Sequence, residues 1–104
     1  MDAIIRGTTP TIVYNMPEEF DPTILVLTWM TFTQEGREVF TIENPPREGN
    51  KFVVKLTQEQ TLGLNSKYKA QHQLRMLTED GTCMATKESE VKVLGILKGG
   101  VMNG

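Results

Sequence analysis

Apolar and polar residues alternate along most of this chain, in short runs bounded by Gly, Pro, Asn and Asp. Alternation with a period of two is typical of β-strands that bury one face. We predict about seven strands from this pattern, and we expect the first of them to kink at residues 7–10. The expected segments are residues 3–6, 11–14, 24–33, 38–43, 51–56, 66–77, and 83–86 continuing at 91–97.

The longest of these segments, residues 24–33, is apolar on both faces. One face carries Leu25, Leu27 and Trp29, and the other carries Val26, Met30 and Phe32. A strand with two apolar faces is typical of the centre of a sheet, where it is covered at least partly on both sides. We expect Trp29 to point inward and to be the indole of the core.

The clearest alternation lies in residues 66–77, which predicts a half-buried antiparallel strand. Its inward face carries Tyr68, Ala70, His72, Leu74 and Met76. Its outward face carries long, adaptable side chains, namely Lys69, Gln71, Gln73 and Arg75. This outward row is a candidate face for binding a protein partner, and a solvated sheet surface explains it equally well.

Turn residues predict how these segments connect. Gly36 within residues 34–37 and Asp80-Gly81 within residues 78–82 supply the backbone angles of tight hairpins. Polar residues 87–89 interrupt the last strand, where we expect a bulge or a switch between sheets.

One short helix is expected near Thr57 to Leu62, because Thr57 and Gln60 have the spacing of a capping box. Leu62 then stands six residues ahead of Tyr68, which opens the alternating strand. This arrangement resembles the tyrosine corner of immunoglobulin-like sandwiches, in which the phenol bonds back to the backbone.

Short strands with turns about every ten residues therefore predict an all-β fold, an immunoglobulin-like antiparallel β-sandwich. An OB-like barrel is the main alternative, although it would need a longer helix between its third and fourth strands. We expect one domain over residues 1–98 and a flexible tail over residues 99–104.

Composition narrows the class of protein. The chain has 104 residues, is 38% hydrophobic and 23% charged, and has a net charge of -2, which suits a folded domain and does not favour nucleic-acid binding. Its single cysteine excludes an intrachain disulfide. The longest apolar run, residues 24–27, is too short for a membrane span, and we expect no signal peptide.

The candidate chemical groups are sparse. His72 is the only histidine, so a metal site built on paired histidines would lack a partner. Its parity places it on the inward face with Tyr68 and Leu74, where we expect a hydrogen-bonded structural histidine. We expect Cys83 to be a small core thiol. We predict no catalytic, metal or cofactor site and no enzyme; a cleft joining His72 and Glu79 would indicate otherwise. Loop residues Met16 and Phe20 and the tip at residues 45–46 are further binding candidates, although Phe20 is expected to fold back onto the core.

Three stretches resemble a family. Residues 4–11, residues 56–62 and the Gln-rich strand that closes on Asp80-Gly81 resemble small virion proteins of phages and prophages of Gram-positive bacteria, and are similar to the N-terminal module of lactococcal upper baseplate proteins. The resemblance implies an immunoglobulin-like component of a tail, baseplate or neck, without catalysis or cofactor.

It further implies a protein located in the virion, assembled in the host cytoplasm, and bound to other phage structural proteins as a homo-oligomer, with no nucleic-acid or membrane partner. The alternative from another class is a small phage-encoded inhibitor that binds a host or defence protein.

Overall fold

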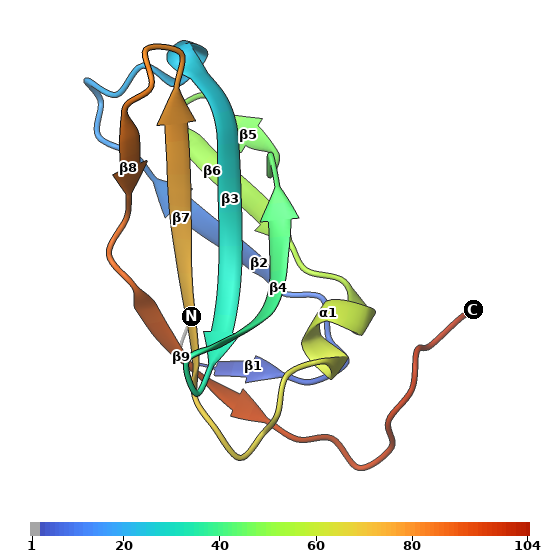
Figure 1. Cartoon of the computed structure of the whole chain (residues 1–104). Helices are drawn as coiled ribbons and strands as arrows, with labels where there is room; N and C mark the ends of the chain where they lie inside the picture. The colour runs from blue at the N-terminus through green and yellow to red at the C-terminus, as the bar shows by residue number, and fades with distance from the viewer. Residues whose placement is uncertain (1–2) are drawn as a thin grey trace.

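Two sheets stack face to face in the computed structural model, which describes residues 3–104 (Figure 1). The larger sheet has the order β1-β9-β7-β3-β4, with β8 also paired to β7, and the smaller has the order β2-β6-β5. The larger sheet comprises β1 (Ala3–Ile5), β3 (Leu25–Gln34), β4 (Arg37–Glu43), β7 (Ala70–Thr78), β8 (Cys83–Ala85) and β9 (Ser89–Leu94). The smaller comprises β2 (Thr11–Asn15), β5 (Arg47–Glu48) and β6 (Lys51–Lys55).

This pairing order confirms the predicted all-β, immunoglobulin-like sandwich. In such folds the middle strands form one sheet of type B-E-D and another of type G-F-C, which a further strand can extend. Here β2-β6-β5 occupies the first pattern and β9-β7-β3-β4 the second. The two separate sheets do not form the barrel of the alternative prediction. The first two positions of the predicted domain 1–98 lie outside the described residues.

The predicted kink in the first strand is a change of sheet. β1 runs parallel to β9, whereas β2 runs antiparallel to β6 in the other sheet. Gly7 makes this crossover with φ of 79°, a conformation that other residues rarely adopt. A Cβ at Gly7 would lie 3.1 Å from Ile96, so this position has little room for a side chain.

The core lies between the sheets and is filled from both. Its largest fully buried side chains include Met30, Phe32 and Leu74 from the larger sheet and Val54 from the smaller. Phe32 stacks on Phe40 with ring centroids 4.8 Å apart. The alternation predicted for residues 66–77 is confirmed within β7 at Ala70, Leu74 and Met76, which are buried, and at Arg75, which is exposed.

The predicted hairpins and helix are present. Glu35 and Gly36 both have positive φ and close the turn between β3 and β4. A short 3-10 turn, η1 (Pro22–Ile24), leads into β3, and α1 (Gln58–Leu62) carries the predicted capping box. The Gln60 backbone N–H donates to the Thr57 Oγ1 at 3.1 Å, and the Thr57 N–H donates to Gln60 Oε1 at 2.9 Å. The helices within residues 3–104 have three and five residues, and none could cross a membrane.

The interruption of the last strand is not a switch between sheets. β8 and β9 both pair with β7, at opposite ends of the same edge. Between them Thr86 makes two hydrogen bonds with Leu74. The Thr86 N–H donates to the Leu74 carbonyl at 3.0 Å, and the Leu74 N–H donates to Thr86 Oγ1 at 3.1 Å. A threonine side chain thus replaces one backbone partner, which splits the predicted strand in two. Nine strands result within the described residues.

Trp29 is not the core indole. It is 39% exposed and points away from the smaller sheet, because Met30 and Phe32 on the opposite face of β3 fill the core. The register of β3 against β7 shifts between Leu25 and Leu27. This bulge leaves Leu25 packed against the core while Leu27 and Trp29 face outward.

Tyr68 does not form a tyrosine corner. It lies ahead of β7 and is 43% exposed. The buried side chain of Gln34 instead connects β3 to the loop before β7. Its amide donates to the Asn65 carbonyl at 2.8 Å and to the Tyr68 carbonyl at 3.1 Å. Its Oε1 accepts from the Asn65 N–H at 2.9 Å. The end of β3 is therefore bonded to the loop that leads into β7.

Candidate functional site

The outward side chains of β7 and β3 form one surface, which we call the outer face. The predicted row Lys69, Gln71, Gln73 and Arg75 lies on it, and Trp29 stands directly opposite Arg75 on the neighbouring strand. Figure 1 shows the molecule with these two strands in front of the smaller sheet. The outer face is therefore the part of the molecule that brings together the most candidate residues.

The polar half of the outer face is bonded within the chain. Lys69 pairs with Glu90 at 3.2 Å, and the Gln71 amide also donates to Glu90. Gln73 donates to the Thr86 carbonyl at 2.7 Å. The hydrogen bond from Lys69 lowers the pKa of Glu90, which keeps this carboxylate charged. These side chains already have partners, so they are poor candidates for the centre of a binding site.

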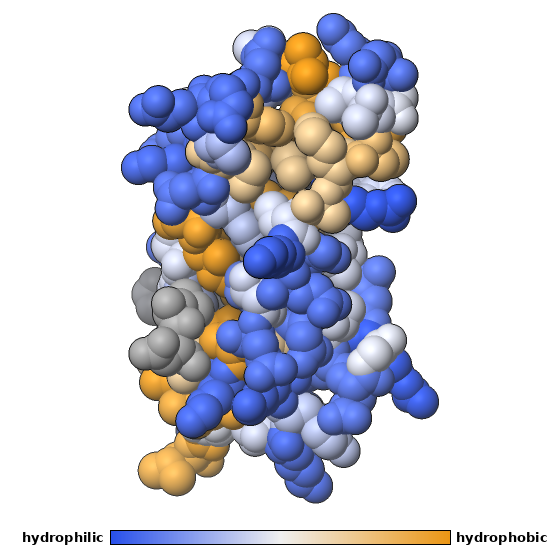
Figure 2. Space-filling view, turned by 90° about the vertical axis from the view of Figure 1, so that its left-hand side faces the viewer, coloured by the Kyte–Doolittle hydropathy of each residue, from blue (hydrophilic) through white to orange (hydrophobic). Residues whose placement is uncertain are grey.

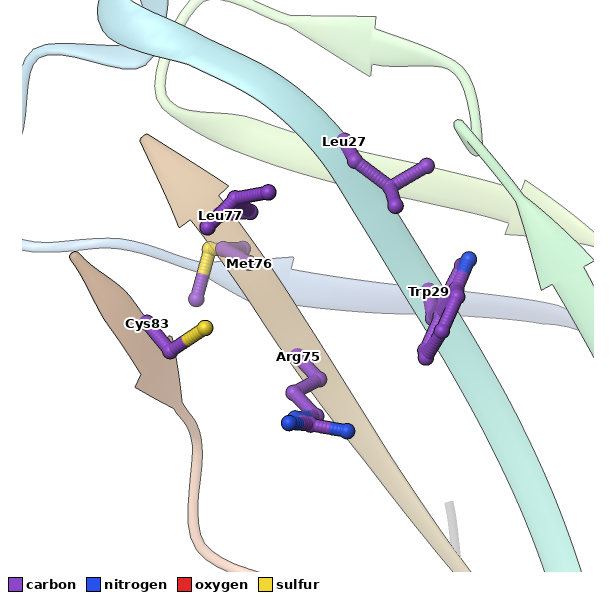
Figure 3. A pocket seen from close by; sticks show the side chains of 6 residues that line it. All are labelled: Leu27, Trp29, Arg75, Met76, Leu77 and Cys83. Atoms are coloured by element: carbon purple, nitrogen blue, oxygen red, sulfur yellow. The ribbon is translucent and has the colours of Figure 1, made fainter. Parts of the chain in front are cut away.

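The other half is apolar and open. A pocket of about 180 Å³ is lined by Leu27, Trp29, Arg75, Met76, Leu77 and Cys83. Figure 3 shows Arg75 and Trp29 side by side on neighbouring strands, with Leu27, Leu77 and Cys83 at the same end of the sheet. Figure 2, which looks onto the β8 side of the molecule, shows apolar surface in its upper part and more along its lower left edge.

The guanidinium of Arg75 lies over the Trp29 ring, 5.8 Å from its centroid. This is the distance of a weak cation–π contact between the two side chains. Val26, in the bulge at the start of β3, is a further exposed apolar residue at 56%. An ordered aromatic side chain beside aliphatic groups has the composition of the centre of a protein interface.

Cys83 is exposed and lies beside this pocket, so the predicted core thiol is wrong. β8 begins directly after the hairpin, and Cys83 stands opposite Leu77, which faces outward. The inward position next to it belongs to Met84, which packs against the core opposite Met76. The strand boundaries were predictable, whereas the face of a three-residue edge strand was not.

His72 is half-buried and hydrogen-bonded, as expected of a structural histidine. Its Nδ1 shares a hydrogen bond with the Tyr14 hydroxyl, and its ring stacks on Phe32 with centroids 5.0 Å apart. Burial raises the pKa of Tyr14 and lowers the pKa of His72, which favours the neutral form of both groups.

A second pocket, of about 410 Å³, opens beside His72 and is lined by Thr11, Ile12, Val13, Ser89 and Glu90 as well. Glu79, the other residue of the possible catalytic cleft, follows the far end of β7. Six or seven strand residues separate it from His72, a distance of about 20 Å. The structure does not bring this pair together.

Most of the loop candidates are covered. At the predicted rigid tip Pro45 is buried whereas Pro46 is exposed, and Met16 and Phe20 pack against the core. The fold-back expected for Phe20 is therefore confirmed. Sequence reasoning missed Leu27, Trp29 and Leu77 as surface residues. The outward parity of Arg75 was the available signal, because any strand paired with it must place a side chain beside it on the same face.

Within residues 3–104, no group of three or more His, Cys, Asp or Glu side chains is arranged to hold a metal ion. Comparison of the chain with protein-family models, with curated proteins and with solved structures finds no match.

Proposed function

We propose that this chain is a non-enzymatic structural or assembly protein of a phage or prophage particle, a component of the tail, baseplate or neck. It acts through contacts with other phage structural proteins. The observation that carries this proposal is the exposed apolar end of the outer face, where Trp29 lies between Arg75, Leu27 and Leu77.

A surface of this composition supports a role in protein contacts. Trp and Arg are the residues that most often dominate the free energy of binding at interfaces, and they do so when aliphatic neighbours exclude water around them. The surface is also built on paired strands of a sheet, which hold its side chains in a fixed arrangement before a partner arrives.

The resemblance to phage virion proteins supports the choice of partner. Two of its three stretches, residues 4–11 and 56–62, meet at one corner of the sandwich. Arg6 donates to the Leu62 carbonyl at 2.8 Å, and Thr61 Oγ1 donates to the Thr8 carbonyl at 2.8 Å. The resembling stretches thus form one connected unit, which fastens α1 to the crossover between the sheets.

Quantitative mass spectrometry of phage particles tests the proposal. The particles would be purified on a density gradient from an induced culture of a host that carries this gene. We expect the chain in the particles at a constant ratio to the major tail proteins. A chain absent from the particles and bound instead to a host protein would support the inhibitor; a chain found with neither would overturn both.

A further inference from the structure

A positively charged residue, an uncharged tryptophan and a negatively charged residue lie in one row across the outer face. Arg75 on β7 is directly opposite Trp29 on β3, and Trp29 is directly opposite Glu43 on β4. Residues directly opposite one another in a sheet project from the same face. The Thr31 and Thr41 hydroxyls, two residue pairs further along the same strands, show this by bonding to each other at 3.0 Å.

Trp29 therefore stands between a cation and an anion. Neighbouring strands lie about 4.8 Å apart, so the backbones of Arg75 and Glu43 are about 10 Å apart. Among residues 3–104, the ion pair that the structure contains is the one between Lys69 and Glu90. Arg75 and Glu43 have no ionic partner within this part of the chain, and Glu43 is exposed.

We propose that the outer face binds a second copy of this chain about a two-fold axis that runs along β3 through Trp29. A rotation about this axis exchanges the two sides of the row. Arg75 of each copy then meets the partner's Glu43, and the two Trp29 side chains meet at the axis. The inference rests on the proposed role in protein contacts and names the partner as the chain itself.

The neighbouring rows are compatible with the same axis. Leu27 lies on the axis and meets the partner's Leu27. Gln73 meets the partner's Thr41, and Gln71 meets the partner's Glu38, because the two residues of each pair stand opposite the same residue of β3, on its two sides. A two-fold axis across the strands would instead oppose Arg75 to the partner's Arg75. Like charges opposed at an interface disfavour that arrangement, whereas two identical patches related by a two-fold axis are the commonest dimer contact.

The size of the face predicts the strength of the dimer. β8, β7, β3 and β4 with their side chains span about 20 Å, and the paired length of β3 and β7 is about 27 Å, which gives a flat area of roughly 500 Å² per copy. A standard stable interface buries about 800 Å² on each partner. We therefore expect a weak dimer, with a dissociation constant of about 1 to 100 μM.

Analytical ultracentrifugation of charge-reversal variants tests the proposal. We expect Arg75→Glu and Glu43→Arg each to weaken self-association by about tenfold or more, because each variant places like charges opposite each other twice. An equimolar mixture of the two variants should recover dimers, because both pairs are again opposite in charge. Lys92→Glu and Glu48→Arg, charge reversals at exposed positions outside the row, should leave the dissociation constant within about twofold.

A wild-type chain that remains monomeric at about 0.5 mM would overturn the proposal, since the expected dissociation constants lie well below this concentration. Recovery that fails in the mixture would overturn the axis. Circular dichroism of each variant verifies that it is folded. These results are independent of the particle experiment. A chain that is monomeric but present in phage particles would contradict only the proposed dimer. A chain that dimerises but is absent from particles would contradict only the proposed phage role.

Discussion

Tyr14 and His72 join the two sheets of the sandwich through a hydrogen bond between the Tyr14 hydroxyl and Nδ1 of His72. Tyr14 comes from β2 in the smaller sheet and His72 from β7 in the larger. Their rings also meet edge to face, with centroids 5.5 Å apart. A polar pair inside a mostly apolar core fixes how the sheets lie against each other, because few arrangements satisfy both groups.

Removal of the Tyr14 hydroxyl should therefore destabilise the fold. We expect Tyr14→Phe to lower the free energy of unfolding by about 1 to 2 kcal/mol, because the His72 nitrogen loses its partner in a half-buried site. Tyr68→Phe is the matched control, because Tyr68 is exposed. Loss of the Tyr68 hydroxyl should change the free energy of unfolding by less than about 0.5 kcal/mol. Urea denaturation of both variants measures the difference, and equal effects would contradict the role of the pair.

His72 should make the free energy of unfolding decrease as pH falls below about 6.5. Burial lowers its pKa below the value of 6.5 that applies in the unfolded chain, so the unfolded state binds the proton more readily. This contribution is complete above pH 6.5 and is lost as pH falls through 6.5 toward the lower folded pKa. Unfolding curves of wild type and His72→Gln across this range should converge at low pH.

Asp80 and Asp21 affect stability at lower pH than His72 does. Hydrogen bonds from Thr78 and Thr82 lower the pKa of Asp80, and those from Thr23 lower the pKa of Asp21. Their contributions are present above their ordinary values near 3.8 and are lost only at lower pH. Parallel profiles for wild type and His72→Gln between pH 5 and 7 would show that His72 titrates alike in both states.

The side chain of Gln34 should contribute more to the free energy of unfolding than that of an ordinary surface glutamine. We expect Gln34→Ala to lower the free energy of unfolding by about 2 to 4 kcal/mol, because it removes three part-buried hydrogen bonds to the backbone of Asn65 and Tyr68. Gln71→Ala on the outer face should cost less than about 1 kcal/mol. Hydrogen exchange at the Asn65 amide should accelerate in the first variant and not in the second.

Much of the fold was predictable because its signals are local. The capping box of Thr57 and Gln60, the glycine at position 36 and the Asp80-Gly81 pair specify their turns through bonds and backbone angles within a few residues. Alternation also predicted the buried face of β7 at Ala70, Leu74 and Met76 and the outward face at Arg75.

The orientation of β3 was not predictable, because both of its faces are apolar. The choice depends on the bulge at Val26 and on which residues of β7 stand opposite, and both arise only when distant segments pair. Gln34 was missed for the same reason, since its partners lie 31 and 34 residues away. The candidate surface was therefore half predicted: Arg75 was placed correctly, and its neighbour Trp29 was assigned to the core.

Trp29 offers a direct test of that reassignment, because it is the only tryptophan in the chain. We expect its fluorescence in the folded monomer to be red-shifted and readily quenched by acrylamide, as for an indole in contact with water. Trp29→Thr should change the free energy of unfolding by less than about 1 kcal/mol, whereas Phe32→Ala, in the core, should lower it by about 3 to 5 kcal/mol. At concentrations where the chain dimerises, quenching should decrease, because the two indoles would then cover each other. Emission that is blue-shifted and protected from acrylamide at every concentration would show that Trp29 is buried in the core. The outer face would then lose its main support as a binding surface.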